Sequence, residues 1–216
     1  MSDNEAQTTV RQRMRHPWSA LGIGAAGAAV VVASALIARN GRVGPVERNI
    51  FEVINGLPDA LKWPMWSFQL VGLLLTPLAV ALVALVLRRW RLALAAVLLM
   101  PLKLYVEKGV LKELVHRERP GVTEVDPILR DAPASGPSFP SGHAIIAFGL
   151  ATLLTPFLSR RWQVVVWTLA VLNGVARIYL GAHNPLDIVG GAGAGVAIGG
   201  VLIFVSGVPA RANRRS

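Results

Sequence analysis

The stretch Phe139-Pro140-Ser141-Gly142-His143 stands directly before a long apolar run. Pro140 cannot continue a preceding helix, and Ser141 is a residue type that caps helix N-termini through its side chain. The stretch therefore predicts a helix whose first free N–H groups, around Gly142, point outward and form an anion site. His143 stands at the edge of this site, where a proton donor is useful. A plain capped helix with an exposed histidine is the alternative interpretation of this stretch alone.

The composition is that of a membrane protein. The chain has 216 residues, of which 53% are hydrophobic and only 16% charged, whereas about 25% are charged in soluble domains. The charges gather in short clusters between long apolar runs, which predicts one integral membrane domain over residues 1–216. The net charge of +10 does not indicate nucleic-acid binding, because the basic residues form no continuous stripe with aromatics. The absence of cysteine excludes disulfides and thiol chemistry.

The apolar runs predict an all-α fold, an integral membrane bundle of six transmembrane helices. We expect these helices over residues 18–38, 68–87, 92 onward, 144–158, 164–180 and 186–205. A cleaved signal peptide is the competing interpretation of the first run, because residues 33–35 resemble a cleavage site. The run is longer than the usual h-region of about 7–15 residues, which favours a retained helix. In the last run, small residues at four-residue intervals predict close helix packing: Gly191, Gly195 and Gly199.

Polar segments separate these runs. Residues 1–16 form a polar tail, and residues 39–65 combine near-helical apolar spacing with tryptophans, which predicts an outer segment lying in the membrane interface. Residues 113–138 form a loop rich in proline, glycine and charge, and its length predicts an outer active-site loop. Within the third span, Lys103 and Glu107 are four residues apart, so we interpret them as a structural ion pair.

The arginines predict the orientation of the chain. Six spans place both termini on one side, and the connections after the second and fourth spans hold arginine and no acid, which is typical of a cytoplasmic face. The arginines of that face are Arg11, Arg13, Arg15, Arg88, Arg89, Arg91, Arg160, Arg161, Arg211, Arg214 and Arg215. The opposite face is also basic, so charge alone discriminates weakly between the two orientations of the chain in the membrane. We expect a multi-pass plasma-membrane protein with a cytoplasmic 1–16 tail and the 113–138 loop on the extracytoplasmic face.

Three segments bring polar residues to that outer face. They supply Lys112, Arg119, Ser141, Gly142, His143, Arg177, His183 and Asp187. Lysine and arginine neutralise phosphate oxygens, one histidine can attack phosphorus, and a second can protonate a leaving oxygen. Asp187, four residues after His183, can bind one imidazole nitrogen and leave the other as a nucleophile. The set therefore predicts a site for phosphoryl chemistry.

Several of these residues also have a structural interpretation when taken singly. Asn184 followed by proline predicts a helix start, which places Asp187 at the third helical position, a common place for an acid. Arg117 and Arg119 can be solvated loop charges, and His116 is interpreted as a surface histidine. An accidental gathering of all these groups on one face is the weaker interpretation of the whole set.

The chain resembles the type 2 phosphatidic acid phosphatase superfamily in three motifs. They stand in the family's order and at its relative spacings: Lys112-x6-Arg119-Pro120, Pro140-Ser141-Gly142-His143 and Arg177-x5-His183-x3-Asp187. The six expected helices extend the resemblance over nearly the whole chain. The family's third motif usually has serine before the arginine, where this chain has Ala176. That difference removes one hydroxyl donor expected near the phosphate.

The resemblance implies hydrolysis of a lipid phosphate or diphosphate without a metal ion or other cofactor. In that scheme His183 attacks phosphorus and forms a phosphohistidine, while Asp187 orients it. His143 protonates the departing oxygen and then activates water. The phosphoryl oxygens are held by Lys112, Arg119, Ser141, Gly142 and Arg177. No carboxylate cluster in the sequence resembles a Mg²⁺ site.

The expected partners are the bilayer and a lipid phosphate that enters from it. A polyprenyl diphosphate of the undecaprenyl or decaprenyl type is the first candidate, and phosphatidic acid or phosphatidylglycerol phosphate is the second. A lipid phosphotransferase can use the same phosphohistidine with another acceptor. A lipid-phosphate binder or carrier is the non-enzyme alternative, which the presence of both His143 and His183 disfavours. Vanadate-dependent haloperoxidases share the motif type but are soluble. The sequence does not indicate an oligomeric state.

Overall fold

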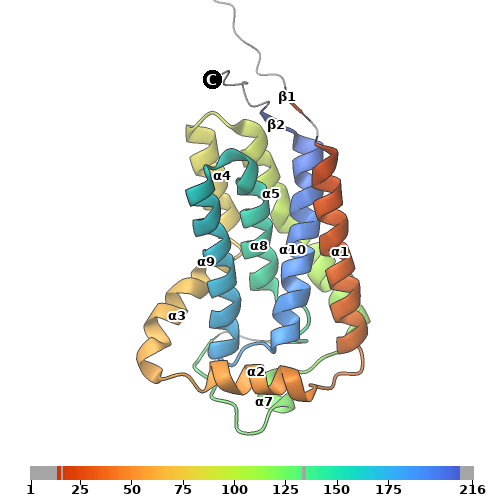
Figure 1. The fold of residues 1–216 in the computed structure, drawn as a ribbon, viewed down its shortest axis with the longest axis vertical. Helices are drawn as coiled ribbons and strands as arrows, with labels where there is room; N and C mark the ends of the chain where they lie inside the picture. Colours follow the sequence, from red (N-terminus) through yellow and green to blue (C-terminus); the bar gives the residue numbers. More distant parts are fainter. Residues whose placement is uncertain (1–13, 16, 133–134, 210–216) are drawn as a thin grey trace, which may run out of the picture.

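A computed structural model describes residues 14–15, 17–132 and 135–209. The fold is helical apart from one pair of two-residue strands, β1 (Met14–Arg15) and β2 (Val208–Pro209), which run antiparallel (Figure 1). The helices are α1 (Trp18–Ala38), α2 (Pro45–Asn55), α3 (Lys62–Gln69), α4 (Thr76–Val86), α5 (Trp90–Leu104), α6 (Lys112–Leu114), α7 (Pro120–Thr123), α8 (Gly142–Leu154), α9 (Arg160–Tyr179) and α10 (Pro185–Ser206). Most of the 1–16 tail and the last predicted arginines lie outside the described residues.

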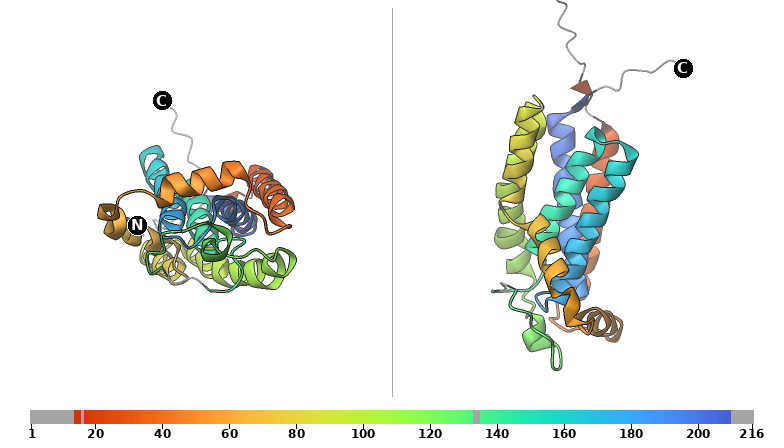
Figure 2. Two further views of the ribbon diagram at one scale, coloured as in Figure 1. Left: turned by 90° about the horizontal axis from the view of Figure 1, so that it is seen from below. Right: turned by 90° about the vertical axis from the view of Figure 1, so that its left-hand side faces the viewer.

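The long helices stand side by side and α2 crosses one end of the bundle (Figure 1). Figure 2 shows this end from below, with α2 running across it. By length and hydropathy α1 and α10 can each cross a membrane, and the helices of Asp59–Gly72 and Thr76–Val86 form a bent third candidate. The chain is therefore a membrane protein with helical spans. The expected bounds of the first and last spans agree with α1 and α10 to within one residue.

The expected span over residues 68–87 is not one continuous helix. A short 3₁₀ turn (Leu70–Gly72) follows α3, the backbone is extended at Leu73, and α4 leaves at 64° to the preceding helix. Pro77 lies in the first turn of α4, where a missing N–H breaks no helical bond. A Cβ on Gly72 would lie 2.6 Å from the carbonyl oxygen of His143. The break therefore allows the chain to pack closely against the start of α8.

The glycines of α10 confirm the predicted packing stripe. A Cβ on Gly195 would lie 2.5 Å from the carbonyl oxygen of Ile145 on α8. On the other side of α10, a Cβ on Gly193 would lie 2.8 Å from the carbonyl oxygen of Gly27 on α1. Only residues without side chains permit these approaches, so α10 packs tightly between α8 and α1. The starts of α8 and α10 consequently meet at the same end of the bundle.

The segment over residues 39–65 contains α2, which holds the long loop in place. The side chain of Asn55 donates to the carbonyl oxygen of Ile128 at 2.9 Å and accepts from its N–H at 2.8 Å. Arg130 is buried and donates to the carbonyl oxygens of Asn55 at 2.8 Å and Tyr179 at 2.6 Å. The 113–138 loop is therefore fastened to both α2 and the end of α9, beside the site described next.

Candidate active site

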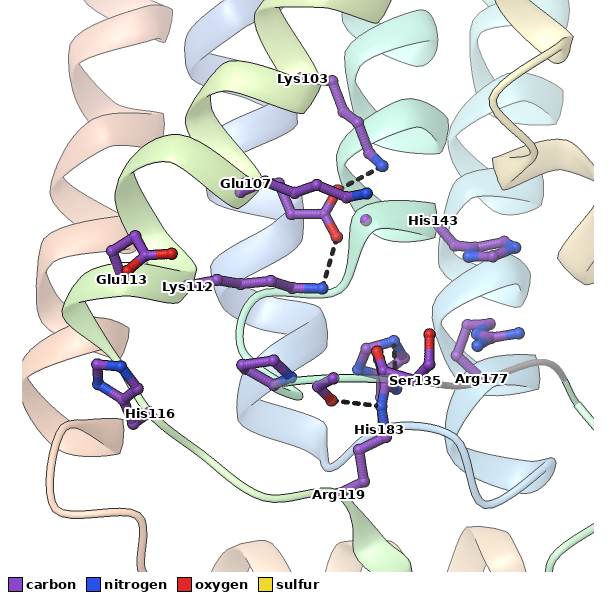
Figure 3. Close-up of a pocket in the computed structure, with 14 residues that line it drawn as sticks. Lys103, Glu107, Lys112, Glu113, His116, Arg119, Ser135, His143, Arg177 and His183 are labelled. Atoms are coloured by element: carbon purple, nitrogen blue, oxygen red, sulfur yellow. Dashed lines mark hydrogen bonds and ion pairs between the residues drawn. The ribbon is translucent and has the colours of Figure 1, made fainter.

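A cavity of about 590 Å³ opens where the end of the α5 helix, the start of α8, the end of α9 and the loop before α10 meet (Figure 3). Six of the eight predicted site residues line it: Lys112, Arg119, Gly142, His143, Arg177 and His183. The other two, Ser141 and Asp187, are fully buried behind its wall. The structure therefore brings the three sequence segments together around one space.

His183 lies in the loop between α9 and α10, against the first turn of α10. Its Nδ1 is 3.6 Å from Oδ2 of Asp187, and its Nε2 is 3.4 Å from Nη1 of Arg119. A guanidinium can only donate, so the facing Nε2 carries the lone pair and the ring proton lies on Nδ1. This is the tautomer that a histidine nucleophile requires.

The environment of His183 keeps its ring uncharged. The side chain is only 3% exposed. Burial lowers the pKa of His183 to about 4, and the hydrogen bond with Asp187 opposes that shift without overcoming it. At neutral pH the imidazole is therefore neutral and able to attack phosphorus.

Asp187 fits both predictions made for it, as an acid at a helix start and as a neighbour of the His183 ring. Its Oδ2 accepts a hydrogen bond from the backbone N–H of Asn184 at 2.9 Å, as an acid in the first turn of a helix does. The same oxygen is the one that lies nearest to Nδ1 of His183. The helix start therefore fixes the carboxylate that orients the imidazole.

Two further residues enclose Asp187, and sequence reasoning did not assign either to the site. Ser138 donates from Oγ to Oδ2 of Asp187 at 2.5 Å and lies 3.4 Å from Nδ1 of His183. Arg117 donates from Nη1 to Oδ1 of Asp187 at 3.1 Å. Every described contact of this carboxylate thus comes from a donor, which stabilises its charged form.

Arg117 is not a solvated loop charge, and that interpretation is wrong. Its side chain is 1% exposed. It binds both oxygens of Glu47 on α2, at 2.9 and 2.6 Å, in addition to Asp187. The cause is the position of α2 across the end of the bundle, which covers the loop and supplies a carboxylate 70 residues away in sequence. No local spacing signals such a pair.

The two cavity arginines are held by specific acceptors. Arg119 is fixed by backbone carbonyl oxygens, at distances of 2.9, 3.0 and 2.6 Å, from Ser135, Gly136 and Ala182. The solvated-charge interpretation of Arg119 is therefore also wrong. Arg177, 1% exposed, donates from Nη1 to Oε1 of Gln69 at 2.5 Å, a partner on α3 that the sequence did not indicate. Both guanidinium groups are thus preorganised at the cavity wall.

The structural ion pair between Lys103 and Glu107 is confirmed, and it has a third member. Nζ of Lys112 lies 2.8 Å from Oε1 of Glu107, while Oε2 contacts Nζ of Lys103. Figure 3 shows the carboxylate lying between the two lysines. Both lysines and Glu107 line the cavity.

The start of α8 differs in one respect from expectation. Ser141 occupies the N-cap position, but its side chain makes no capping hydrogen bond, so that prediction is wrong. The residue is pressed against α10, where its N–H donates to the carbonyl oxygen of Asp187 at 2.9 Å. A Cβ on Gly142 would lie 2.7 Å from both Nζ of Lys103 and Oε2 of Glu107. A side chain at this position would therefore displace the ends of the Lys103 and Glu107 side chains.

The remaining predicted features fall at the edge of the site. His116 is exposed, as expected of a surface histidine, and it stands on the cavity rim. Ala176 is fully buried in an apolar cluster with Met65 and Tyr179, so no hydroxyl reaches the cavity from that position. Within residues 17–132 and 135–207, no group of three or more His, Cys, Asp or Glu side chains is placed to hold a metal ion.

Known proteins resemble this chain over the segments that line the cavity. A sequence model of the PAP2 superfamily matches residues 90–207. The chain is 33% identical over 129 residues to the lipid A 4'-phosphatase of Bacteroides thetaiotaomicron, a match that covers 54% of this chain and 56% of the relative. The chain thus spans little more than half the length of that relative. It is 31% identical over 158 residues to YbjG, a putative undecaprenyl-diphosphatase of Escherichia coli, covering 68% and 76% of the two chains.

A solved structure shares the fold. It is the crystal structure of a transmembrane PAP2 type phosphatidylglycerolphosphate phosphatase from Bacillus subtilis. The two structures align with a TM-score of 0.67 at 22% identity, over 82% of this chain and 94% of the other. The helical arrangement is therefore common to both proteins.

Proposed function

The chain belongs to the PAP2 superfamily of membrane lipid phosphatases, and from this premise we propose that it hydrolyses a lipid phosphate or diphosphate through a phosphohistidine. The observation that carries the proposal is the neutral, buried His183, whose Nε2 faces a cavity lined by His143 and by arginine and lysine. A binder needs the cations but has no use for an oriented, uncharged imidazole. The arrangement therefore favours an enzyme over a lipid-phosphate carrier.

The reaction has two steps. Nε2 of His183 attacks the terminal phosphorus, the bond to the leaving oxygen breaks, and His143 donates a proton to that oxygen. His143 then takes a proton from water, the water oxygen attacks the phosphohistidine, and the P–N bond breaks to release inorganic phosphate. Asp187 stabilises the positive charge that develops on His183.

Fixed cations stabilise the charge on the phosphoryl oxygens in both steps. Arg119, Arg177 and Lys112 supply this charge at the cavity, and the N–H groups at the start of α8 add a helix N-terminus. The chemistry that Mg²⁺ performs in other phosphoryl-transfer sites is assigned here to side chains. Ser141 is assigned a supporting role behind the wall, where it fixes the start of α8.

A polyprenyl diphosphate is the substrate that we put first. The similarity to a putative undecaprenyl-diphosphatase supports this choice. The two lysines beside Glu107, together with Arg119 and Arg177, also give the cavity more positive charge than one phosphate group of about −2 requires. Phosphatidylglycerol phosphate or phosphatidic acid is the second candidate, in line with the B. subtilis structure of the same fold. A phosphotransferase differs only in the acceptor that replaces water.

The arrangement in the membrane is also proposed. We assign six transmembrane units to α1, the bent α3–α4 pair, α5 with α6, α8, α9 and α10, all within one domain. The apolar surface of the 39–65 segment supports a place at the outer interface, because Val46, Val53 and Trp63 are more than two-thirds exposed. The 113–138 loop and the cavity then lie on the extracytoplasmic face of the plasma membrane.

The proposed function is tested with purified protein in detergent. Inorganic phosphate is measured after incubation with farnesyl diphosphate, farnesyl phosphate, phosphatidic acid, phosphatidylglycerol phosphate and a water-soluble phosphate ester. Release from the lipids, absent in His183→Ala, is expected. Strict activity on the soluble ester would defeat the lipid assignment. Binding of the lipids without release, unchanged by His183→Ala, would instead establish the carrier.

Metal independence is the first prediction. Because lysine and arginine side chains are proposed to stabilise the charge on the phosphoryl oxygens, the reaction should need no metal ion. Excess EDTA should therefore leave phosphate release nearly unchanged. Vanadate, which mimics five-coordinate phosphorus, should inhibit. Loss of activity in EDTA that Mg²⁺ restores would contradict the proposed mechanism.

Sidedness is the second prediction, and this cysteine-free chain allows a direct measurement. Val125 in the long loop is 79% exposed, so Val125→Cys should react with an impermeant maleimide in intact cells. Ser159→Cys, at the opposite end of the bundle, should react only after the membrane is permeabilised. The reverse pattern would overturn the orientation.

A further inference from the structure

The helix that carries Lys112 changes its geometry immediately before that residue. Over Tyr105–Leu111, 7 residues form a π-helix between α5 and α6. In a regular α-helix, nine residues correspond to a rotation that would place Lys112 about 180° from Lys103. The i→i+5 bonding of the π-helix brings Lys112 beside Glu107 instead. Both lysines consequently face the cavity, which α-helical geometry would not allow.

The charges of this cluster do not balance. In the described part of the chain, the ion pairs of both Lys103 and Lys112 go to Glu107. Two ammonium groups and one carboxylate leave one positive charge, although Lys103 and Glu107 are only 9% and 4% exposed. An unbalanced charge at this depth is costly, and such charges usually face a partner or a pathway. An anionic ligand in the cavity would supply the missing negative charge.

Lys103 stands at a definite place relative to the proposed chemistry. In Figure 3, Arg119 and His183 lie at the outer end of the cavity, His143 lies farther in, and Lys103 lies farthest toward the middle of the bundle. Lys103 also contacts the start of α8, since a Cβ on Gly142 would lie 2.7 Å from its Nζ. A second phosphate that extends inward from the terminal phosphorus at His183 would therefore come toward Lys103.

We infer that Lys103 binds the second, lipid-proximal phosphate of a diphosphate and so determines selectivity for diphosphates over monophosphates. The inference rests on the proposed function. When His183 attacks, the bond between the terminal phosphorus and the bridging oxygen breaks, and the electron pair stays on that oxygen. The leaving group is the lipid monophosphate; His143 supplies a proton to it and Lys103 neutralises its remaining charge. Lys112, two helical turns farther out, remains with the terminal phosphate.

The test compares farnesyl diphosphate with farnesyl monophosphate, which share one lipid chain. In Lys103→Met, kcat/KM for the diphosphate should fall roughly 10- to 100-fold, the size of one hydrogen bond to a charged group. For the monophosphate, kcat/KM should change by less than about threefold, since its single phosphate stays with the cations at His183. Lys103→Arg should keep the preference. Lys103→Gln, which retains a donor toward Glu107 without the charge, should lose the preference as Lys103→Met does.

Lys108→Met is the matched control. Lys108 is an exposed lysine on the rim of the same cavity, and the same substitution there should preserve the ratio of the two kcat/KM values. Equal losses on both substrates in Lys103→Gln would overturn the inference, as would a wild-type preference for the monophosphate. Either result leaves a lipid monophosphatase intact. Absence of phosphate release by the wild type from both substrates and from the glycerolipids would instead overturn the proposed function.

Discussion

His183→Ala is expected to abolish both turnover and covalent labelling. Without Nε2 no P–N bond can form, and removal of a nucleophile costs roughly 10⁴-fold or more in kcat. The measurement is a rapid quench in alkaline detergent after mixing with a lipid diphosphate labelled with ³²P in its terminal phosphate, followed by detection of protein-bound label that acid removes. The structure makes the expectation specific, because Asp187 and Ser138 both bind the opposite, Nδ1 side of this imidazole.

His143→Ala should give a different result in the same assay. Loss of the proton donor should lower turnover roughly 10²- to 10⁴-fold. A substrate with a good leaving group needs little protonation, so His183 should still become labelled, and the label should persist because no base activates water. Label retained in His183→Ala but lost in His143→Ala would exchange the two roles.

Arg117→Met is expected to destabilise the protein more than any exposed charge substitution. The change leaves the buried carboxylate of Asp187 and the partly buried carboxylate of Glu47 without the guanidinium that binds both. Breaking such a buried ion pair costs about 3–5 kcal/mol, which corresponds to a fall of roughly 10 °C in the thermal midpoint for a chain of this size. The midpoint can be followed by circular dichroism of the purified protein in detergent.

Lys62→Met is the control for that measurement. Lys62 pairs with Asp131, whose side chain is 83% exposed, at 3.1 Å. Exposed pairs contribute about 0–1 kcal/mol, so the midpoint should move little. An Arg117→Met protein as stable as Lys62→Met would show that the Glu47–Arg117–Asp187 contacts do not hold α2 to the start of α10.

Much of the site could be predicted because its residues lie at helix ends. The limits of the apolar runs mark those ends. The number of membrane spans between two helix ends, even or odd, decides whether they lie on the same side of the membrane. His143 opens α8, and Asp187 lies in the first turn of α10. Arg177 lies in the last turn of α9. Each could therefore be placed at one end of the bundle from its own segment, without knowledge of any contact.

The partners of these residues could not be predicted in the same way. Glu47 and Gln69 reach the site from α2 and α3, across 70 and 108 positions of sequence. Their contacts depend on α2 crossing the end of the bundle and on the break at Leu73, and both are set by tertiary packing. Regular α-helical spacing found the Lys103–Glu107 pair, but it gave no sign that Lys112, correctly expected at the cavity, also contacts Glu107.

The π-helical segment has a consequence for how this helix can vary in length. Lys112 follows Lys103 by nine positions, and the π-helical turn places both lysines on the same side of the helix as Glu107. In a continuous α-helix, the second lysine would have to follow the first by eight positions to lie on that side. Deletion of Gly109 together with a return to α geometry would therefore preserve the cluster, whereas an α-helix of the present length would not. In a homologous chain that is one residue shorter here, the lysine equivalent to Lys103 should accordingly stand eight positions before the lysine equivalent to Lys112.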